Sequence, residues 1–167
     1  MRVVADTSAL LALYSCGGLP LLDRLFQEVR VPQAVFDECT VAGKPGKEKL
    51  GIYLKNKVEG IELSGFMIAS SGLGRGELEA LALYKRWQAD RLLIDDHRAR
   101  KLAALNGVAV IGSLGVLLLA KSKGHIVSIR PSIDSIRQAG IYLGDGLVAE
   151  ALLLRGNKVK LYESFGI

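Results

Sequence analysis

The chain has 167 residues and a mass of 18.0 kDa, and half of its residues are hydrophobic, so it is long enough for one well-formed core and short for two. Its 22 lysines and arginines outnumber 17 aspartates and glutamates, and the resulting net charge of +5 favours polyanionic partners without identifying one. Cys16 and Cys39 form no CxxC pair and accompany only two histidines, so the sequence indicates neither a disulfide framework nor a zinc site and fits a reducing cytoplasm.

Short strand-like runs alternate with helical patterns over the first 124 residues. Strands are predicted at 2–5, 28–31, 91–94 and 108–112, and each precedes a predicted helix, at 8–15, 32–43, 97–107 and 113–124. The alternation predicts βαβ units and an α/β fold, in which a parallel sheet lies between two layers of helices. Such sheets bind ligands beyond the carboxyl ends of their strands.

Three further regions complete the predicted organisation. Residues 43–60 are Lys-rich and follow a Pro/Gly turn, and we expect an exposed helix there. The helix after Gly76 is apolar nearly all round, which is typical of a central, largely buried helix. Beyond Gly124 two more helices are predicted, the first opened by Pro131. We take residues 125–167 as a C-terminal helical extension, so that 1–167 form a single domain.

Neither a signal peptide nor a membrane span is predicted. The N-terminal stretch MRVVAD reaches an acid at position six, before a signal-like apolar region develops. The longest weakly polar stretch, residues 108–120, contains two glycines and is shorter than the roughly 18 apolar residues that indicate a span. We therefore expect a cytoplasmic protein with no membrane partner.

Acidic residues follow two of the predicted strands directly. Asp6 ends the first strand, and Asp95 and Asp96 stand side by side after the apolar run RLLI. Capping of the next helix by Asp6, Thr7 or Ser8 explains the first stretch as well as a functional role does, and capping also explains Asp96. Capping explains one aspartate of the adjacent pair better than two, so a function for the pair remains open.

Two predicted helices carry further acids. Helical spacing places Glu38 as the lone charge on the inward face of its helix, where an uncompensated carboxylate is costly. Glu77 and Glu79 lie in the first turn of the central helix, where acids are favourable for structural reasons alone. The two are about 200 degrees apart on the helical wheel, so one site is not expected to take both, and Glu77 is our first candidate.

Joint placement of these acids predicts a metal site. Side chains that follow neighbouring strands would converge, and like charges about 4 Å apart repel by about 4 kcal/mol at an effective dielectric of 20. A hard divalent cation relieves that repulsion, and Mg²⁺ or Mn²⁺ prefers carboxylate oxygens. Such a site suits metal-assisted phosphodiester hydrolysis, with basic side chains to contact the substrate backbone: Arg75, Arg98, Arg100, Lys101 and the lysines of 44–57.

The ordered stretches VVADTSALLAL, VPQAVFDE, GRGELEALAL and LLIDDHRARKLAALNGVAVIGSLGVLL resemble a PIN domain, the metal-dependent nuclease fold of the VapC-like toxins. The resemblance covers roughly residues 1–124. The chain differs from those toxins in its Lys-rich insertion and its C-terminal extension, and it is more similar to a prokaryotic PIN-like subgroup with a Gly-Glu-x-Glu-Ala third motif.

The resemblance implies a PIN-like three-layer fold with four to five parallel strands and an endoribonuclease that uses Mg²⁺ or Mn²⁺. It makes Asp6 the first metal ligand, supported by Thr7 or Ser8, and Glu38 the second acid. Asp95, aided by Asp96, is the acid after the fourth strand, and Glu77 stands where many members carry aspartate. It also implies RNA as substrate, a homodimer and, for a toxin, an antitoxin partner.

Three other readings compete with a nuclease. A signalling receiver domain would carry its acid pair near the N-terminus, the reverse of the order seen here, and a haloacid dehalogenase phosphatase would need an aspartate where Ser8 stands. The stronger rival is a catalytically weak PIN-like module that binds RNA or a protein and retains the acids for structure.

Overall fold

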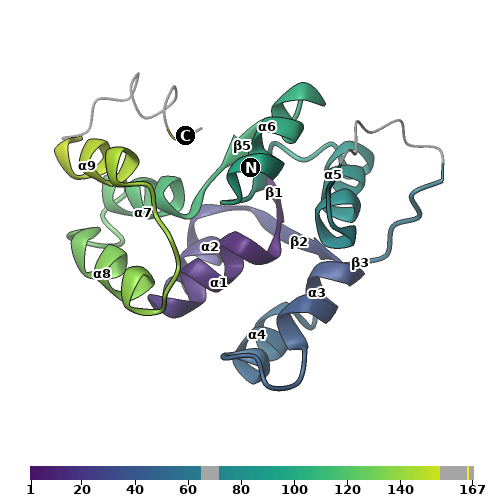
Figure 1. The fold of residues 1–167 in the computed structure, drawn as a ribbon, viewed down its shortest axis with the longest axis horizontal. Helices are drawn as coiled ribbons and strands as arrows, with labels where there is room; N and C mark the ends of the chain where they lie inside the picture. Colours follow the sequence, from purple (N-terminus) through teal and green to yellow (C-terminus); the bar gives the residue numbers. More distant parts are fainter. Residues whose placement is uncertain (65–71, 155–164, 166–167) are drawn as a thin grey trace.

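A parallel five-stranded sheet forms the centre of the part of the chain that the computed structural model describes, residues 1–64, 72–154 and 165 (Figure 1). The strand order is β3-β2-β1-β4-β5, and every pairing is parallel. The strands are β1 (Arg2–Ala5), β2 (Glu28–Pro32), β3 (Val58–Glu59), β4 (Arg91–Leu93) and β5 (Val110–Ile111). The predicted α/β class and parallel sheet are thus confirmed.

Helices cover both faces of the sheet and give three layers. Within the described residues they are α1 (Thr7–Ser15), α2 (Leu19–Leu25), α3 (Gln33–Thr40), α4 (Lys47–Leu54), α5 (Arg75–Trp87), α6 (His97–Leu105), α7 (Ser113–Ser122), α8 (Arg130–Gln138) and α9 (Asp145–Leu153). Helices α5 and α6 pack on one face, and α1, α2 and α7 pack on the other.

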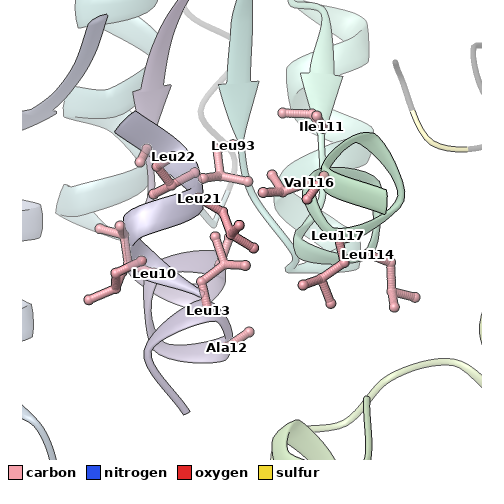
Figure 2. Close-up of a cluster of buried hydrophobic side chains, with 14 of the residues drawn as sticks. Leu10, Ala12, Leu13, Leu21, Leu22, Leu93, Ile111, Leu114, Val116 and Leu117 are labelled. Atoms are coloured by element: carbon pink, nitrogen blue, oxygen red, sulfur yellow. The ribbon is translucent and has the colours of Figure 1, made fainter. Parts of the chain in front are cut away.

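Strand residues alternate between the two faces and are buried on both. Val3 and Ala5 of β1 join the core under α1 and α7, whereas Val4 joins the core under α5 and α6. This two-sided burial explains why the strands are short continuous apolar runs rather than alternating ones. Figure 2 shows the larger cluster, in which leucines of α1 and α2 pack against residues of β4, β5 and α7. The leucines are Leu10, Leu13, Leu21 and Leu22, and their partners in the cluster include Leu93, Ile111, Val116 and Leu117.

The C-terminal helices share this larger core. Helix α8 contacts α1, and α9 contacts α7, so both lie on the same side of the sheet (Figure 1). Ile133, Ile136, Val148 and Ala151 are buried within the same cluster as the leucines of α1. The residues after 124 therefore complete the packing of α1 and α7. No helix in the described ranges is both long and apolar enough to cross a bilayer.

The structure contains two elements that the sequence did not predict, helix α2 and strand β3, and the prediction for residues 43–60 is wrong in part. Helix α2 begins with Pro20 in its first turn, and the two-residue strand β3 pairs with the end of β2. The expected exposed helix within 43–60 is α4, but Leu50 and Leu54 on one of its faces are fully buried because α4 packs against α3. Strand β3 occupies the end of that predicted helix.

Candidate active site

The order of the strands creates a crevice beside β1. From β1 the chain passes to β2 on one side, while β4 pairs with the other side of β1. Ligands of doubly wound sheets bind at such a switch point, outside the carboxyl ends of the strands. The backbone N–H of Asp6 donates to the carbonyl of Leu93 (2.9 Å), which holds the two strand ends together at this point.

A hollow of about 400 Å³ opens at this crevice, and four carboxylates line it. They come from four separate segments: the residue before α1, the middle of α3, the first turn of α5 and the residue before α6. The lining acids are Asp6, Glu38, Glu77 and Asp96, together with Thr7, Ser8 and Gly74. Of the five acids that the sequence singled out, Asp95 alone is absent from this lining.

Asp6 is buried at the floor of the crevice with only 4% of its surface exposed. Its Oδ2 accepts hydrogen bonds from the Ser8 hydroxyl (2.8 Å) and the Ser8 backbone N–H (3.1 Å), so it caps α1 while facing the hollow. Burial raises the pKa of the Asp6 carboxyl to about 6, and the charge of Glu77 adds to this rise, whereas the bonds from Ser8 oppose it. No basic side chain lines the hollow among the described residues.

Glu38 reaches the hollow from α3 and is held by a hydroxyl of α1. The Thr7 Oγ1 hydroxyl donates to Glu38 Oε2 at 2.6 Å. The carboxylate also lies against α5, where a Cβ at position 76 would stand 2.6 Å from Glu38 Oε1. Gly76 therefore allows the close approach of Glu38 to the helix that carries Glu77.

The two glutamates of α5 have different environments. Glu77 accepts a hydrogen bond from the Gly74 N–H (2.7 Å) through Oε2, which closes the start of α5, and it lines the hollow. Glu79 is 4% exposed and accepts from the Ala34 N–H of α3 (3.0 Å) and from Arg75 Nε (2.8 Å). Glu79 thus joins α5 to the first turn of α3.

The adjacent aspartates after β4 also differ. Asp96 is exposed and caps α6 by accepting from the Ala99 N–H (2.8 Å). Asp95 Oδ1 accepts from the Ser113 N–H at the start of α7 (2.7 Å), and the Asp95 N–H donates to the Ser8 hydroxyl (3.1 Å). Ser8 therefore bridges Asp95 and Asp6.

Asp95 is half-buried, and its two carboxylate oxygens have different contacts. Its Oδ2 is fully buried and has no hydrogen-bond partner within the described structure. Burial raises the pKa of the Asp95 carboxyl, and the bond from Ser113 and the charge of Arg100 oppose that rise. This position holds the starts of α1 and α7 rather than the hollow.

The basic residues expected to contact substrate divide into two groups. Arg75 pairs with Glu79, and Arg100 is half-buried with Nη1 donating to the Ile94 carbonyl (3.0 Å). Arg98 and Lys101 are exposed on α6. Lys44, which the sequence placed only in the general basic run, donates from Nζ to the Glu38 carbonyl (3.1 Å). No pattern in the sequence distinguished Lys44 from the other lysines.

The expected tight cluster of acids is not formed. Across residues 1–64, 72–154 and 165, no group of three or more His, Cys, Asp or Glu side chains is arranged as a metal site. Four of the five predicted carboxylates share the hollow, and each of the five accepts a hydrogen bond from a hydroxyl or a backbone N–H nearby. The donor set at the hollow is nevertheless all oxygen, which is the chemistry that Mg²⁺ and Mn²⁺ prefer.

The sequence reasoning did not identify the roles of Gly76 and Ser113. Gly76 directly precedes Glu77 within a glycine-spaced stretch, and that spacing is the one local signal that could have indicated a close approach of chains. Ser113 contributes a backbone N–H, which any residue other than proline would supply, so no sequence signal marks it.

Comparison with protein families gives one match, to the PIN domain, over residues 2–157. Because this match spans most of the chain, the protein belongs to the PIN domain family, a family of nucleases that generally use divalent metals and act on RNA. The matched region extends past residue 124, where the resemblance in the sequence ended, and includes α8 and α9. No curated protein matches the chain significantly.

Proposed function

We propose that this protein is a Mg²⁺- or Mn²⁺-dependent endoribonuclease that hydrolyses RNA phosphodiester bonds at the acidic hollow. The observation that carries the proposal is the convergence of Asp6, Glu38, Glu77 and Asp96 on one hollow from four segments of the chain. These segments meet at the switch point of a parallel sheet, where this architecture binds ligands. Membership of a nuclease family supports the same conclusion.

The four hollow carboxylates are the residues that would hold the metal. Glu38 and Glu77 each use Oε2 for a hydrogen bond within the protein, and a carboxylate has further lone pairs with which to bind a cation. A divalent ion in this position supplies an activated water and stabilises the charge that develops on the phosphate. A nearby cation would also favour the ionised form of Asp6, whose pKa burial raises to about 6.

Other side chains of the site position these acids. Ser8 fixes the Asp6 carboxylate and receives the Asp95 N–H, so Asp95 acts through Ser8 on Asp6. Thr7 fixes Glu38 in the same way. Arg98 and Lys101 lie exposed on α6, the helix that Asp96 caps, and we assign them to the phosphates of the substrate.

A specific observation favours a second candidate, an RNA-binding module with little or no catalysis. Every hollow carboxylate accepts a hydrogen bond from the protein itself, and no metal-ready group of three is present among the described residues. In this alternative the acids cap helices, and the fold serves binding alone.

Cleavage assays separate the two candidates. Single-stranded and structured RNA would be incubated with the protein in Mn²⁺, Mg²⁺ or chelator, alongside Asp6→Asn and Glu38→Gln. The nuclease proposal expects cutting only with metal and almost none by either variant. Asp37→Asn is a matched control, because Asp37 is an exposed neighbour of Glu38 outside the hollow. RNA binding in chelator with no cutting in either metal would favour the binding module.

The most specific form of the proposal is a cytoplasmic toxin that forms a homodimer and is restrained by an antitoxin. Family membership alone supports it. It expects growth arrest when the protein is produced in bacterial cells, and normal growth with Asp6→Asn. Co-production of a small DNA-binding protein encoded beside it would relieve the arrest, and light scattering would give the mass of a dimer. Normal growth with active enzyme would contradict the toxin role.

A further inference from the structure

A second and larger cavity, of about 920 Å³, lies beside the acidic hollow. Ser8 and Asp96 line both, so the two adjoin at the starts of α1 and α6. The rest of the larger cavity is walled mainly by α1, by the start of α7, by residues 141–144 before α9 and by Leu147 in the first turn of α9. None of the chemistry assigned to the hollow uses this space.

The walls of the larger cavity are mostly apolar, with a polar end toward the hollow. Leu11 of α1, Leu114 of α7 and Leu143 are among its apolar lining residues. Tyr142 also lines it and is 84% exposed, so its ring is open to a ligand. The charged and imidazole lining residues of the cavity are Asp95, Asp96, His97 and Arg100.

We propose that this cavity receives an unstacked base of a single-stranded RNA whose neighbouring phosphodiester lies at the acidic hollow, with Tyr142 as the stacking surface. Proteins that bind single-stranded RNA commonly stack splayed bases on aromatic rings and line their paths with positive charge. The inference rests on the proposed function, because the hollow sets where the phosphate lies. It adds a residue that would contact the substrate beyond the acids already assigned, Tyr142.

Two features favour a nucleotide over the side chain of a protein partner. The lining of the cavity combines apolar walls with Asp96, which also lines the hollow, and a nucleotide likewise joins an apolar base face to a phosphate. Arg100 also lines the cavity; its Nη1 donates to the Ile94 carbonyl, and an apolar peptide side chain would give its other guanidinium N–H groups no acceptor. A base within a duplex would first have to leave its stack, at a cost of a few kcal/mol.

Binding in chelator, where no metal-dependent cutting takes place, tests the inference. The probes are a fluorescent hexaribonucleotide, the same oligomer with one base removed at each position in turn, and an RNA duplex. We expect Tyr142→Ala to weaken binding of the hexamer about fivefold to a hundredfold, the loss typical of one stacked base. Tyr142→Phe should bind as the parent does, because it keeps the ring.

Two further variants separate stacking from a general loss of structure. Leu153→Ala changes an exposed residue of α9 that does not line the cavity, and it should bind normally. Gly144→Leu adds a side chain where a Cβ meets nothing within 4 Å, and it should weaken binding by narrowing the cavity. Removal of the base at one position of the oligomer should weaken binding by the parent. The parent and Tyr142→Ala should then bind that oligomer with equal affinity.

Three results would overturn the inference. The first is that the parent protein does not bind the hexamer at up to millimolar concentration. The second is that Tyr142→Ala and the parent bind the hexamer equally well. The third is that Tyr142→Ala loses the same affinity for the duplex as for the hexamer. Cutting in Mn²⁺ that Tyr142→Ala leaves unchanged on single-stranded RNA would reject the base site and leave the nuclease standing. If binding depends on Tyr142 but the parent cuts RNA in neither metal, the base site would stand and the nuclease proposal would be rejected.

Discussion

The two acid pairs of the crevice, Glu77 with Glu79 and Asp95 with Asp96, divide in the same way. In each pair one carboxylate lines the hollow, and the other accepts the N–H of a different helix. Glu79 thereby joins α5 to α3, which carries Glu38, and Asp95 joins the end of β4 to α7. Acids that are neighbours in the sequence therefore have different positions: one of each pair lines the hollow, and the other joins two elements of the fold.

The same contrast holds for the two most buried carboxylates. Asp6 and Glu79 are each 4% exposed. Glu79 is compensated by Arg75 and by the Ala34 N–H, whereas Asp6 has only the hydroxyl and N–H of Ser8 and lies near the charge of Glu77. A structural acid thus has its counterion within the protein, and the hollow acid does not.

The largest expected effect is on cleavage. Asp6→Asn should lower the rate of RNA cutting in Mn²⁺ by about a hundredfold or more, since it removes a charge that would hold the metal. Glu79→Gln is the matched control, because the amide oxygen can still accept the Ala34 N–H, and it should retain most of the activity. Equal losses in the two variants, measured as initial rates, would erase the distinction between the hollow acid and the structural acid.

The second effect is on stability: Asp6→Asn, which should lose activity, should be more stable than the parent. Because folding raises the pKa of Asp6 from 3.8 to about 6, the native state binds more protons between these values, and the free energy of unfolding falls as pH rises through that window. The ionised carboxyl then costs about 3 kcal/mol at pH 7 in chelator. Asp6→Asn should therefore gain up to about 3 kcal/mol relative to the parent between pH 4 and pH 7.

Urea unfolding of both proteins across this pH range measures the difference. Taking the variant minus the parent cancels the contributions of acids that both proteins share. A difference that stays flat from pH 4 to pH 7 would show that the Asp6 carboxyl is not held in an uncompensated site.

Truncation of the two glutamates of α5 should affect stability and activity in opposite order. Glu79→Ala leaves the Ala34 N–H without its acceptor and should cost about 1–3 kcal/mol of unfolding free energy. Glu77→Ala removes a bond at the exposed start of α5 and should cost only about 0.5–1 kcal/mol, yet it should lower cleavage more. Denaturation and initial rates of both variants check this, and the same ranking in both measurements would contradict it.

A small change in stability is also expected for Gly76→Ala, which tests the close approach of Glu38. The new Cβ would stand 2.6 Å from Glu38 Oε1, so the Glu38 side chain must move. Cleavage should fall about tenfold to a hundredfold, as expected for a misplaced site group, while stability changes by no more than about 1 kcal/mol. Gly74→Ala is the control, because its Cβ would make an ordinary 3.6 Å contact with Glu77.

Much of the fold was predictable because its signals are local. The strands are apolar runs, the helices that follow them are periodic, and Asp6 and Asp95 follow strand ends in the sequence itself. Helix α2 and strand β3 were missed because a seven-residue helix and a two-residue strand are too short to show a period, and β3 is defined by its pairing with β2.

The division within the acid pairs was only partly accessible from the sequence. The helical wheel separates Glu77 from Glu79, and the position of Glu38 on the inward face of α3 is likewise a local property. Whether Asp95 or Asp96 faces the hollow depends on where α7 begins relative to β4, a contact between residues 18 positions apart. Tertiary packing decides that choice, and no local pattern encodes it.

The central proposal is that the hollow carboxylates hold a divalent cation while Glu79 and Asp95 beside them do not. The direct measurement is the rise in unfolding free energy on adding Mn²⁺ to the parent, Asp6→Asn and Asp95→Asn. At an Mn²⁺ concentration 100 times its Kd, the parent and Asp95→Asn should each gain about 2.7 kcal/mol, and Asp6→Asn should gain almost nothing. Equal gains in all three proteins, or no gain in the parent, would contradict the account.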